Sequence, residues 1–175
     1  MKNIVLTGYM ASGKTTTGKL LSKRLDMNFL DTDEIISENE DMSINEIFEK
    51  YGEAYFRKAE NELSKKLMSV TDSIISTGGG FVLNKENIEN LRSCGVIINL
   101  AVSDNTVKKR YAEAQATRPL IKNENIDAIL KRFNDRKEFY ANCDAAVLIN
   151  ETDSAEYVCE KVIEAYKNFL NKERK

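Results

Sequence analysis

Residues 8–15 read Gly-Tyr-Met-Ala-Ser-Gly-Lys-Thr, which is the spacing of a phosphate-binding loop. An apolar, β-branched run at residues 3–7 precedes the loop and predicts a buried strand, and residues 14–26 predict a helix after it. In such a unit the glycines let successive backbone N–H groups point at phosphate oxygens, and the helix N-terminus adds partial positive charge. The sequence therefore predicts a nucleoside triphosphate site on an α/β fold.

Two side chains of the loop have defined tasks in a site of this kind. Lys14 is placed to reach the β- and γ-phosphates, and the Thr15 hydroxyl is placed to ligate Mg²⁺. The expected nucleotide contacts of the loop are Ala11, Ser12, Gly13, Lys14, Thr15 and Thr16.

The composition is that of one globular domain. Apolar residues make up 42% of the 175 residues and charged residues 31%, which is enough for a core. With a net charge of −2, no basic field draws the chain to nucleic acid or to an anionic membrane. No apolar run is long enough to cross a bilayer, and no signal-peptide pattern opens the sequence. We expect a cytoplasmic monomer with no nucleic-acid or membrane partner.

The chain has no histidine and three scattered cysteines. The lack of histidine excludes a histidine general base, a histidine-bearing zinc site and a Ser-His-Asp triad. The cysteines lack the spacing of metal ligands and are expected to be reduced thiols. Acid–base chemistry must therefore come from carboxylates, lysines or a bound metal.

Strand-like runs alternate with helical patterns along the whole chain. The runs after the first strand fall at residues 29–30, 73–76, 96–100 and 145–149. This alternation predicts one domain over residues 1–175, a three-layer α/β/α fold with a central parallel sheet of about five strands, of the P-loop kinase type. Right-handed crossovers bring the carboxyl ends of the strands, where ligands bind, to one edge of the sheet.

The helical patterns make two local predictions. Tyr55, Ala59, Leu63 and Leu67 recur at every fourth residue and predict the buried face of one helix. The last helix is predicted to begin after a cap at Asp153.

Two aspartates, Asp31 and Asp33, follow the second strand-like run and should lie at the ligand-binding edge. In an extended segment they share one side, with Thr32 opposite. One carboxylate could hold Mg²⁺ and the other could polarise a substrate hydroxyl. Helix N-capping is the alternative, and the residues alone leave both open.

A glycine cluster, Gly78, Gly79 and Gly80, follows the third strand-like run and should reach the same edge. Three successive glycines can bring backbone N–H groups close to a ligand. A flexible turn is the alternative.

Residues 111–123 link a helical pattern that ends near Arg110 to one that starts near Asn125. The stretch is polar, contains the only proline and carries Arg118 and Lys122. A lid that lowers arginine onto phosphates fits this composition, and so does a solvated connector with incidental charges.

Three further arginines leave the same kind of alternative open. Arg57 lies four residues after Glu53 and three before Glu60, so both carboxylates can hold its guanidinium on a helix. Arg132 and Arg136 are one helical turn apart. Each arginine could be aimed at an anion, or could belong to an ordinary solvated face.

Taken together, these motifs resemble the shikimate kinase family. The resemblance covers the whole chain, in order and at the family's approximate spacings. Many kinases share the phosphate-binding loop, whereas the Asp-Thr-Asp and triple-glycine pair is much more specific. The motifs are the loop at 8–15, Asp31-Thr32-Asp33, Phe56-Arg57-Lys58-Ala59-Glu60, Gly78-Gly79-Gly80, Arg118-Pro119-Leu120, and Arg136 with Tyr140.

The resemblance implies an ATP-dependent enzyme that phosphorylates the 3-hydroxyl of shikimate in aromatic amino acid biosynthesis, giving shikimate 3-phosphate and ADP. ATP and shikimate are the implied partners, and Mg²⁺ is the implied cofactor. A substrate-binding helical segment at about 32–62 and a lid at about 111–123 are implied as parts of the single domain.

On the nucleotide side, the resemblance implies that Lys14 holds the β- and γ-phosphates and Thr15 ligates Mg²⁺. Asp31 reaches Mg²⁺ through water, Arg118 comes from the lid to the phosphates, and Arg110 packs on adenine.

On the acceptor side, the resemblance implies that Asp33 binds the ring hydroxyls and orients or deprotonates the one attacked. Arg57 and Arg136 clamp the substrate carboxylate, whose planar geometry suits arginine forks. Backbone at Gly78, Gly79 and Gly80 lines the same pocket.

One departure from the family is Ala11, where the family usually has glycine. Alternatives to the reading are a kinase for gluconate or a nucleoside monophosphate, and a GTP-binding switch protein. A dianionic acceptor would be repelled by Asp33. Residues 84–87 nearly match a guanine-binding motif but begin a helical pattern, and no strand-like run is followed by the Asp-x-x-Gly of GTP switches.

Overall fold

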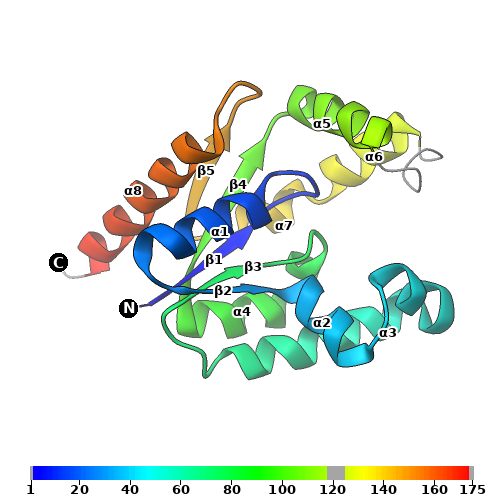
Figure 1. The fold of residues 1–175 in the computed structure, drawn as a ribbon, viewed down its shortest axis with the longest axis horizontal. Helices are drawn as coiled ribbons and strands as arrows, with labels where there is room; N and C mark the ends of the chain where they lie inside the picture. Colours follow the sequence, from blue (N-terminus) through cyan, green and yellow to red (C-terminus); the bar gives the residue numbers. More distant parts are fainter. Residues whose placement is uncertain (1, 118–124, 174–175) are drawn as a thin grey trace.

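The computed structural model describes residues 2–117 and 125–173, and they form an α/β fold around one sheet (Figure 1). Five strands lie in the order β2-β3-β1-β4-β5, and every neighbouring pair is parallel. The strands are β1 Asn3–Thr7, β2 Asn28–Asp31, β3 Ser73–Ser76, β4 Gly95–Val102 and β5 Ala145–Ile149. The predicted fold class is confirmed, including the number of strands and their parallel arrangement.

Helices cover both faces of the sheet (Figure 1). The helices are α1 Lys14–Leu25, α2 Thr32–Glu40, α3 Ile44–Leu67, α4 Lys85–Cys94, α5 Asp104–Thr117, α6 Ile126–Asp135, α7 Lys137–Ala141 and α8 Ala155–Glu173, with a 3-10 turn η1 at Phe81–Leu83. Helices α1 and α8 pack on one face, and α3, α4 and α7 pack on the other. Strand side chains alternate between the two faces of the sheet. Ile4 and Leu6 therefore pack in the core under α1 and α8, and Val5 packs in the core on the other face, and all three are fully buried.

The strand register places the carboxyl ends of three strands level with one another. Leu6 in β1 pairs with Ser76 in β3, and Ser76 pairs with Asp31 in β2. The segments that follow these three strands therefore start side by side at one edge of the sheet, as predicted for a ligand-binding edge.

Helix α3 differs from the predicted pattern by one residue. Phe56 is buried, whereas Tyr55 is 37% exposed and its ring stacks 4.7 Å from Tyr51. An α-helix has 3.6 residues per turn, so positions spaced by four drift by about 40° at each step, and a strict four-residue repeat traced back from Leu67 leaves the buried face at Tyr55. Gly52, with φ 80°, interrupts the helical geometry before this stretch. In Figure 1, α2 and the first half of α3 extend away from the sheet.

Two helix boundaries also differ from expectation. Ser154 rather than Asp153 caps α8, since its hydroxyl accepts from the backbone N–H of Tyr157, while Asp153 accepts from the N–H of Asn150. Helix α5 continues past Arg110 to Thr117, so the predicted lid begins inside a helix. No helix in the described parts of the chain is both long and apolar enough to cross a membrane.

Candidate active site

A cavity of about 680 Å³ opens at the carboxyl edge of the sheet. Its walls come from the phosphate-binding loop, the start of α2, the segment after β3, and the facing sides of α5 and α6. The predicted site residues that line it are Ala11, Gly13, Lys14, Thr15, Thr16, Asp31, Asp33, Gly78, Gly79 and Arg110. Ser12 is buried in the loop beside them, and Arg118 lies outside the described residues.

The phosphate-binding loop closes on its own lysine. Lys14 is 8% exposed, and its Nζ donates to the carbonyl oxygens of Gly8 at 2.8 Å and Tyr9 at 2.9 Å. Burial lowers the pKa of Lys14 to about 8, although the nearby charges of Asp33 and Asp31 act in the opposite direction. The ammonium therefore lies ready beside the cavity, held by neutral carbonyls that a phosphate would outcompete.

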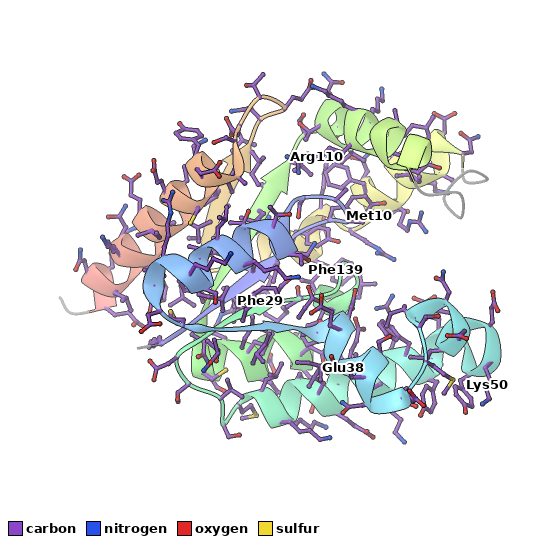
Figure 2. The ribbon with its side chains drawn as sticks, viewed as in Figure 1. Met10, Phe29, Glu38, Lys50, Arg110 and Phe139 are labelled. Carbon is purple, nitrogen blue, oxygen red and sulfur yellow. The ribbon has the colours of Figure 1, made fainter. Side chains whose placement is uncertain are left out.

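Ala11 has an unusual backbone conformation for a residue with a side chain. Its φ is 59°, in the left-handed region that favours glycine, which fits the glycine found in the family at this position. Its carbonyl oxygen accepts from Nη1 of Arg110 at 2.7 Å, so α5 contacts the loop directly. Arg110 and Met10, labelled in Figure 2, mark this side of the cavity.

Asp31 makes two hydrogen bonds, one of which is the helix cap considered from the sequence. Its Oδ1 accepts from the backbone N–H of Asp33 at 3.1 Å, so it caps α2. Its Oδ2 accepts from the Thr15 hydroxyl at 3.0 Å. The Oδ2 of Asp31 and the hydroxyl oxygen of Thr15 fit Mg²⁺, which proteins usually hold through one or two side chains together with substrate phosphates. Among the described residues there is no cluster of three or more His, Cys, Asp or Glu side chains that could hold a metal ion.

Asp33 lies in the first turn of α2 instead of an extended segment, and its carboxylate packs against Gly78. Burial raises the pKa of Asp33, the charge of Asp31 raises it further, and Lys14 and Arg57 lower it. Its Oδ1 is buried and accepts no hydrogen bond from the described residues. An unpaired, buried carboxylate oxygen is a strong acceptor for a substrate hydroxyl.

The glycine cluster has a steric reason at two positions. A Cβ at Gly78 would overlap Oδ1 of Asp33, and a Cβ at Gly80 would overlap the guanidinium of Arg57. The hydroxyl of Thr32, a residue the sequence did not single out, accepts from the N–H of Gly78 at 2.9 Å. The cluster is therefore a close-packed wall rather than a flexible turn.

Arg57 is held by the two predicted glutamates. Nη1 lies 2.7 Å from Glu60 and Nη2 lies 2.8 Å from Glu53, while the arginine side chain remains 25% exposed. Glu60 is only 1% exposed, and burial raises its pKa to about 7 against the opposing effect of Arg57. Arg57 is thus fixed beside Asp33 and Gly80 and is more than a surface ion pair.

Arg136 is the residue between α6 and α7. Burial raises the pKa of Tyr140 to about 12, and the charges of Arg136 and Arg57 both lower it. Tyr140 in turn donates to the carbonyl of Gly79, so both arginines lie near a side chain that contacts the glycine wall. Neither Arg57 nor Arg136 lines the cavity itself, and their shared contact with one carboxylate stays a prediction.

The cavity also has walls that sequence reasoning missed: Tyr9, Val107, Tyr111 and Ile129. Val107 and Tyr111 are one helical turn apart on α5, which is a signal that spacing could have provided. Tyr9 and Ile129 meet only through the tertiary fold, since the Tyr9 hydroxyl donates to the Ile129 carbonyl 120 positions away.

The fold and the cavity place this protein among the small-molecule kinases that carry a phosphate-binding loop. A parallel sheet with the loop after its central strand β1 supplies the phosphate side, and carboxylates and arginines supply a polar acceptor side.

Comparisons with known proteins narrow the class. Residues 10–167 match the family model described as "Shikimate kinase". The chain is 43% identical over 166 residues to a protein named shikimate kinase from Caldicellulosiruptor bescii, covering 93% of this chain and 94% of that protein. A crystal structure of shikimate kinase from Aquifex aeolicus matches with 33% identity and a TM-score of 0.80, covering 95% of this chain and 96% of that chain. A solved structure of shikimate kinase from Acinetobacter baumannii in complex with shikimate matches with 29% identity and a TM-score of 0.85, covering 96% of this chain and 94% of that chain.

The chain belongs to the shikimate kinase family. It is an ATP-dependent phosphotransferase with an alcohol group as acceptor, and it acts in the shikimate pathway. The gluconate, nucleoside monophosphate and GTP-switch alternatives are therefore set aside.

Proposed function

We propose that this enzyme transfers the γ-phosphoryl group of ATP to the 3-hydroxyl of shikimate, with Mg²⁺ as cofactor, and works as a cytoplasmic monomer. The observation that carries the proposal is the position of Asp33. Its unpaired oxygen packs against Gly78, and the charges of Lys14 and Arg57 both act on its carboxylate. A hydroxylated carboxylate that fills this space presents a hydroxyl to Asp33 and its carboxylate to the arginines.

On the nucleotide side, Lys14 exchanges the carbonyls of Gly8 and Tyr9 for β- and γ-phosphate oxygens. Thr15 and Asp31 hold Mg²⁺, which neutralises phosphate charge when bound. Arg110 shifts from the Ala11 carbonyl to pack on adenine. Backbone N–H groups from Ala11 to Thr16 cradle the phosphates, because the loop leads directly into the N-terminus of α1.

On the acceptor side, Asp33 accepts a hydrogen bond from the attacking hydroxyl and orients or deprotonates it. Its raised pKa suits either task, since a carboxylate that binds protons more tightly is a better base. Arg57 and Arg136 hold the substrate carboxylate in planar forks. The acceptor pocket is lined by Gly78, Gly79 and Gly80. Glycine is needed at positions 78 and 80 because a side chain there would displace Asp33 and Arg57.

Closure completes the site in this proposal. Residues 111–123 act as the lid, and Arg118 adds positive charge at the transferring phosphoryl group. The segment 32–62, which includes α2 and most of α3, forms the substrate-binding part of the domain.

The test is ATP consumption measured in parallel with shikimate, shikimate methyl ester, gluconate and nucleoside monophosphates. We expect turnover with shikimate and a rate at least tenfold lower with the ester, which removes the charge that the arginines recognise. Equal turnover of acid and ester would contradict the carboxylate clamp. Preferred turnover of gluconate or a monophosphate would contradict the substrate.

A further inference from the structure

Tyr9 occupies an unusual position, since its two ends contact different parts of the active site. Its carbonyl oxygen, in the phosphate-binding loop, accepts from Nζ of Lys14 at 2.9 Å. Its hydroxyl, at the far end of the side chain, donates to the main-chain carbonyl of Ile129 in α6 at 3.0 Å. The residue is 2% exposed, so this hydrogen bond is shielded from water.

The ring of Tyr9 supports the junction that carries Arg136. It lies 4.9 Å from the ring of Phe133 and meets the ring of Tyr140 edge-on at 6.4 Å. Phe133 and Tyr140 are three residues before and four residues after Arg136, so Tyr9 contacts one helical turn on each side of it. Tyr140 in turn donates to the carbonyl of Gly79 in the glycine wall.

The opposite side of this junction is not filled. A second cavity of about 410 Å³, between α7 and the ends of β4 and β5, is lined by Tyr9, Asn99, Phe133, Tyr140 and Cys143. The rings of Tyr9, Phe133 and Tyr140 are nonetheless only 2–5% exposed and belong to one core cluster. The hydrogen bond from the Tyr9 hydroxyl adds a directional contact between this cluster and α6.

We propose that Tyr9 is a positioning residue that couples nucleotide binding to the placement of Arg136. When ATP takes Lys14 away from the loop carbonyls, the main chain of Tyr9 loses a partner while its side chain stays fixed to α6. A shift of the loop is thereby passed to the junction that carries the arginine. The inference rests on the proposed roles of Lys14 and Arg136 and adds the residue that links them.

The quantity that tests this link is a coupling ratio, the Kd for shikimate measured without and with a saturating non-hydrolysable ATP analogue. A link between two sites appears as a ratio above one, typically about 5–150. Tyr9→Phe removes only the hydroxyl and keeps the ring contacts. We expect it to lower the ratio about fivefold or to near one, the size expected from a single neutral hydrogen bond. Its Kd for the analogue alone should stay within about twofold of wild type.

The chain offers a matched control in Tyr166→Phe. Tyr166 is also a buried tyrosine, 5% exposed, and its hydroxyl donates to the main-chain carbonyl of Lys2. This hydrogen bond joins the two ends of the chain, far from the cavity, so its loss should lower Tm without changing the coupling ratio. A purely structural role for Tyr9 predicts equal behaviour of the two variants, and that outcome overturns the proposal.

Two further results would overturn the inference: an unchanged ratio in Tyr9→Phe, and a wild-type ratio of one. If Tyr9→Phe lowers Tm more than Tyr166→Phe, then Phe133→Leu is the second variant, since it removes the ring nearest Tyr9 and leaves the hydroxyl. Because the hydrogen bond to α6 remains, Phe133→Leu should keep the coupling ratio near that of wild type. A fall as large as that of Tyr9→Phe would count against the hydrogen bond as the link. Wild-type turnover of shikimate reports on the proposed function, so the link and the function can fail separately.

Discussion

The two halves of the active site are built in different ways. The nucleotide half is a local structure, in which Lys14 is held by carbonyls five and six residues before it. The proposed acceptor half would join Asp33, Arg57, Gly80 and Arg136, which come from four separate segments of the chain. The nucleotide half is formed mainly by backbone geometry, and the acceptor half mainly by buried, charged side chains.

This difference also appears in how well polar groups are satisfied. The loop lysine donates to two carbonyls at ordinary distances. The acceptor half, in contrast, leaves one oxygen of Asp33 and one of Glu60 buried without a partner among the described residues. Buried unpaired acceptors are costly, and a bound substrate or ordered water can relieve that cost. We therefore expect the acceptor half to respond more strongly to pH and to its own ligand.

The largest expected effect is in the nucleotide half. Lys14→Ala removes a donor to the charge that develops on the transferred phosphoryl group and should lower kcat about 10²–10³-fold. Lys23→Ala, on the exposed side of the same helix, is the control and should be near wild type. Steady-state kinetics measure both. Near-normal activity of Lys14→Ala would contradict the role of Lys14 in the nucleotide half.

The next effect separates the two aspartates. Asp33→Asn keeps the size of the side chain but removes the charge that polarises the hydroxyl, so kcat should fall about 10²-fold or more with little change in ATP binding. Asp31→Asn should instead raise the Mg²⁺ concentration needed for half-maximal rate, because Asp31 lies against Thr15. Mg²⁺ titrations of both variants test this assignment. Identical Mg²⁺ titration curves would contradict the assignment of Asp31 to the metal and of Asp33 to the acceptor hydroxyl.

The third prediction uses pH to show that the acceptor half carries buried charge. Glu60 has a folded-state pKa of about 7 against an ordinary value of 4.5. A raised acid pKa stabilises the fold fully below the ordinary value, and this contribution is lost as pH rises through the folded value. The wild type should therefore lose stability relative to Glu60→Gln between about pH 4.5 and 7, by about 1.4 kcal/mol for each unit of pKa difference.

Denaturant unfolding across this pH range measures the effect, with Glu62→Gln as the control. Glu62 lies on the same helix, is 60% exposed and pairs with Lys58, so its substitution should leave the pH slope unchanged. Parallel pH profiles of wild type and Glu60→Gln would mean that the pKa of Glu60 is the same in the folded and unfolded states. The burial of Glu60 would then carry no measurable cost.

A smaller effect tests whether the arginines act as forks. Arg136→Lys keeps the charge but loses the planar pair of donors, and it should raise KM for shikimate about tenfold, or about 1.4 kcal/mol. Arg57→Ala should do the same, and KM for ATP should barely change in either variant. Initial rates over both substrates measure this. A change in KM for ATP as large as that for shikimate would place the arginine in the nucleotide half.

The same contrast explains what the sequence could predict. The loop, the five parallel strands and the level strand ends all follow from local patterns, and the structure agrees with them. The exposed Tyr55 was misassigned because a repeat of exactly four residues drifts around a helix that has 3.6 residues per turn. The meeting of Tyr9 with Ile129 depends on the packed fold and has no signature in spacing. The roles proposed for Arg57 and Arg136 come from the motif resemblance, because residue physics alone left them open.

The smallest effect concerns the one position where the loop departs from its family. Ala11 has φ 59°, and a non-glycine residue in this region costs about 1–2 kcal/mol. Ala11→Gly removes that strain but adds about 0.4–1 kcal/mol of freedom to the unfolded chain, so the free energy of unfolding should change little. Ala54→Gly makes the identical substitution at an exposed helical position of α3, where it should cost about 1 kcal/mol. Denaturant unfolding of both variants gives the comparison. A loss at Ala11 as large as that at Ala54 would show that the loop is not left-handed there in solution, and that its geometry depends on more than the local backbone.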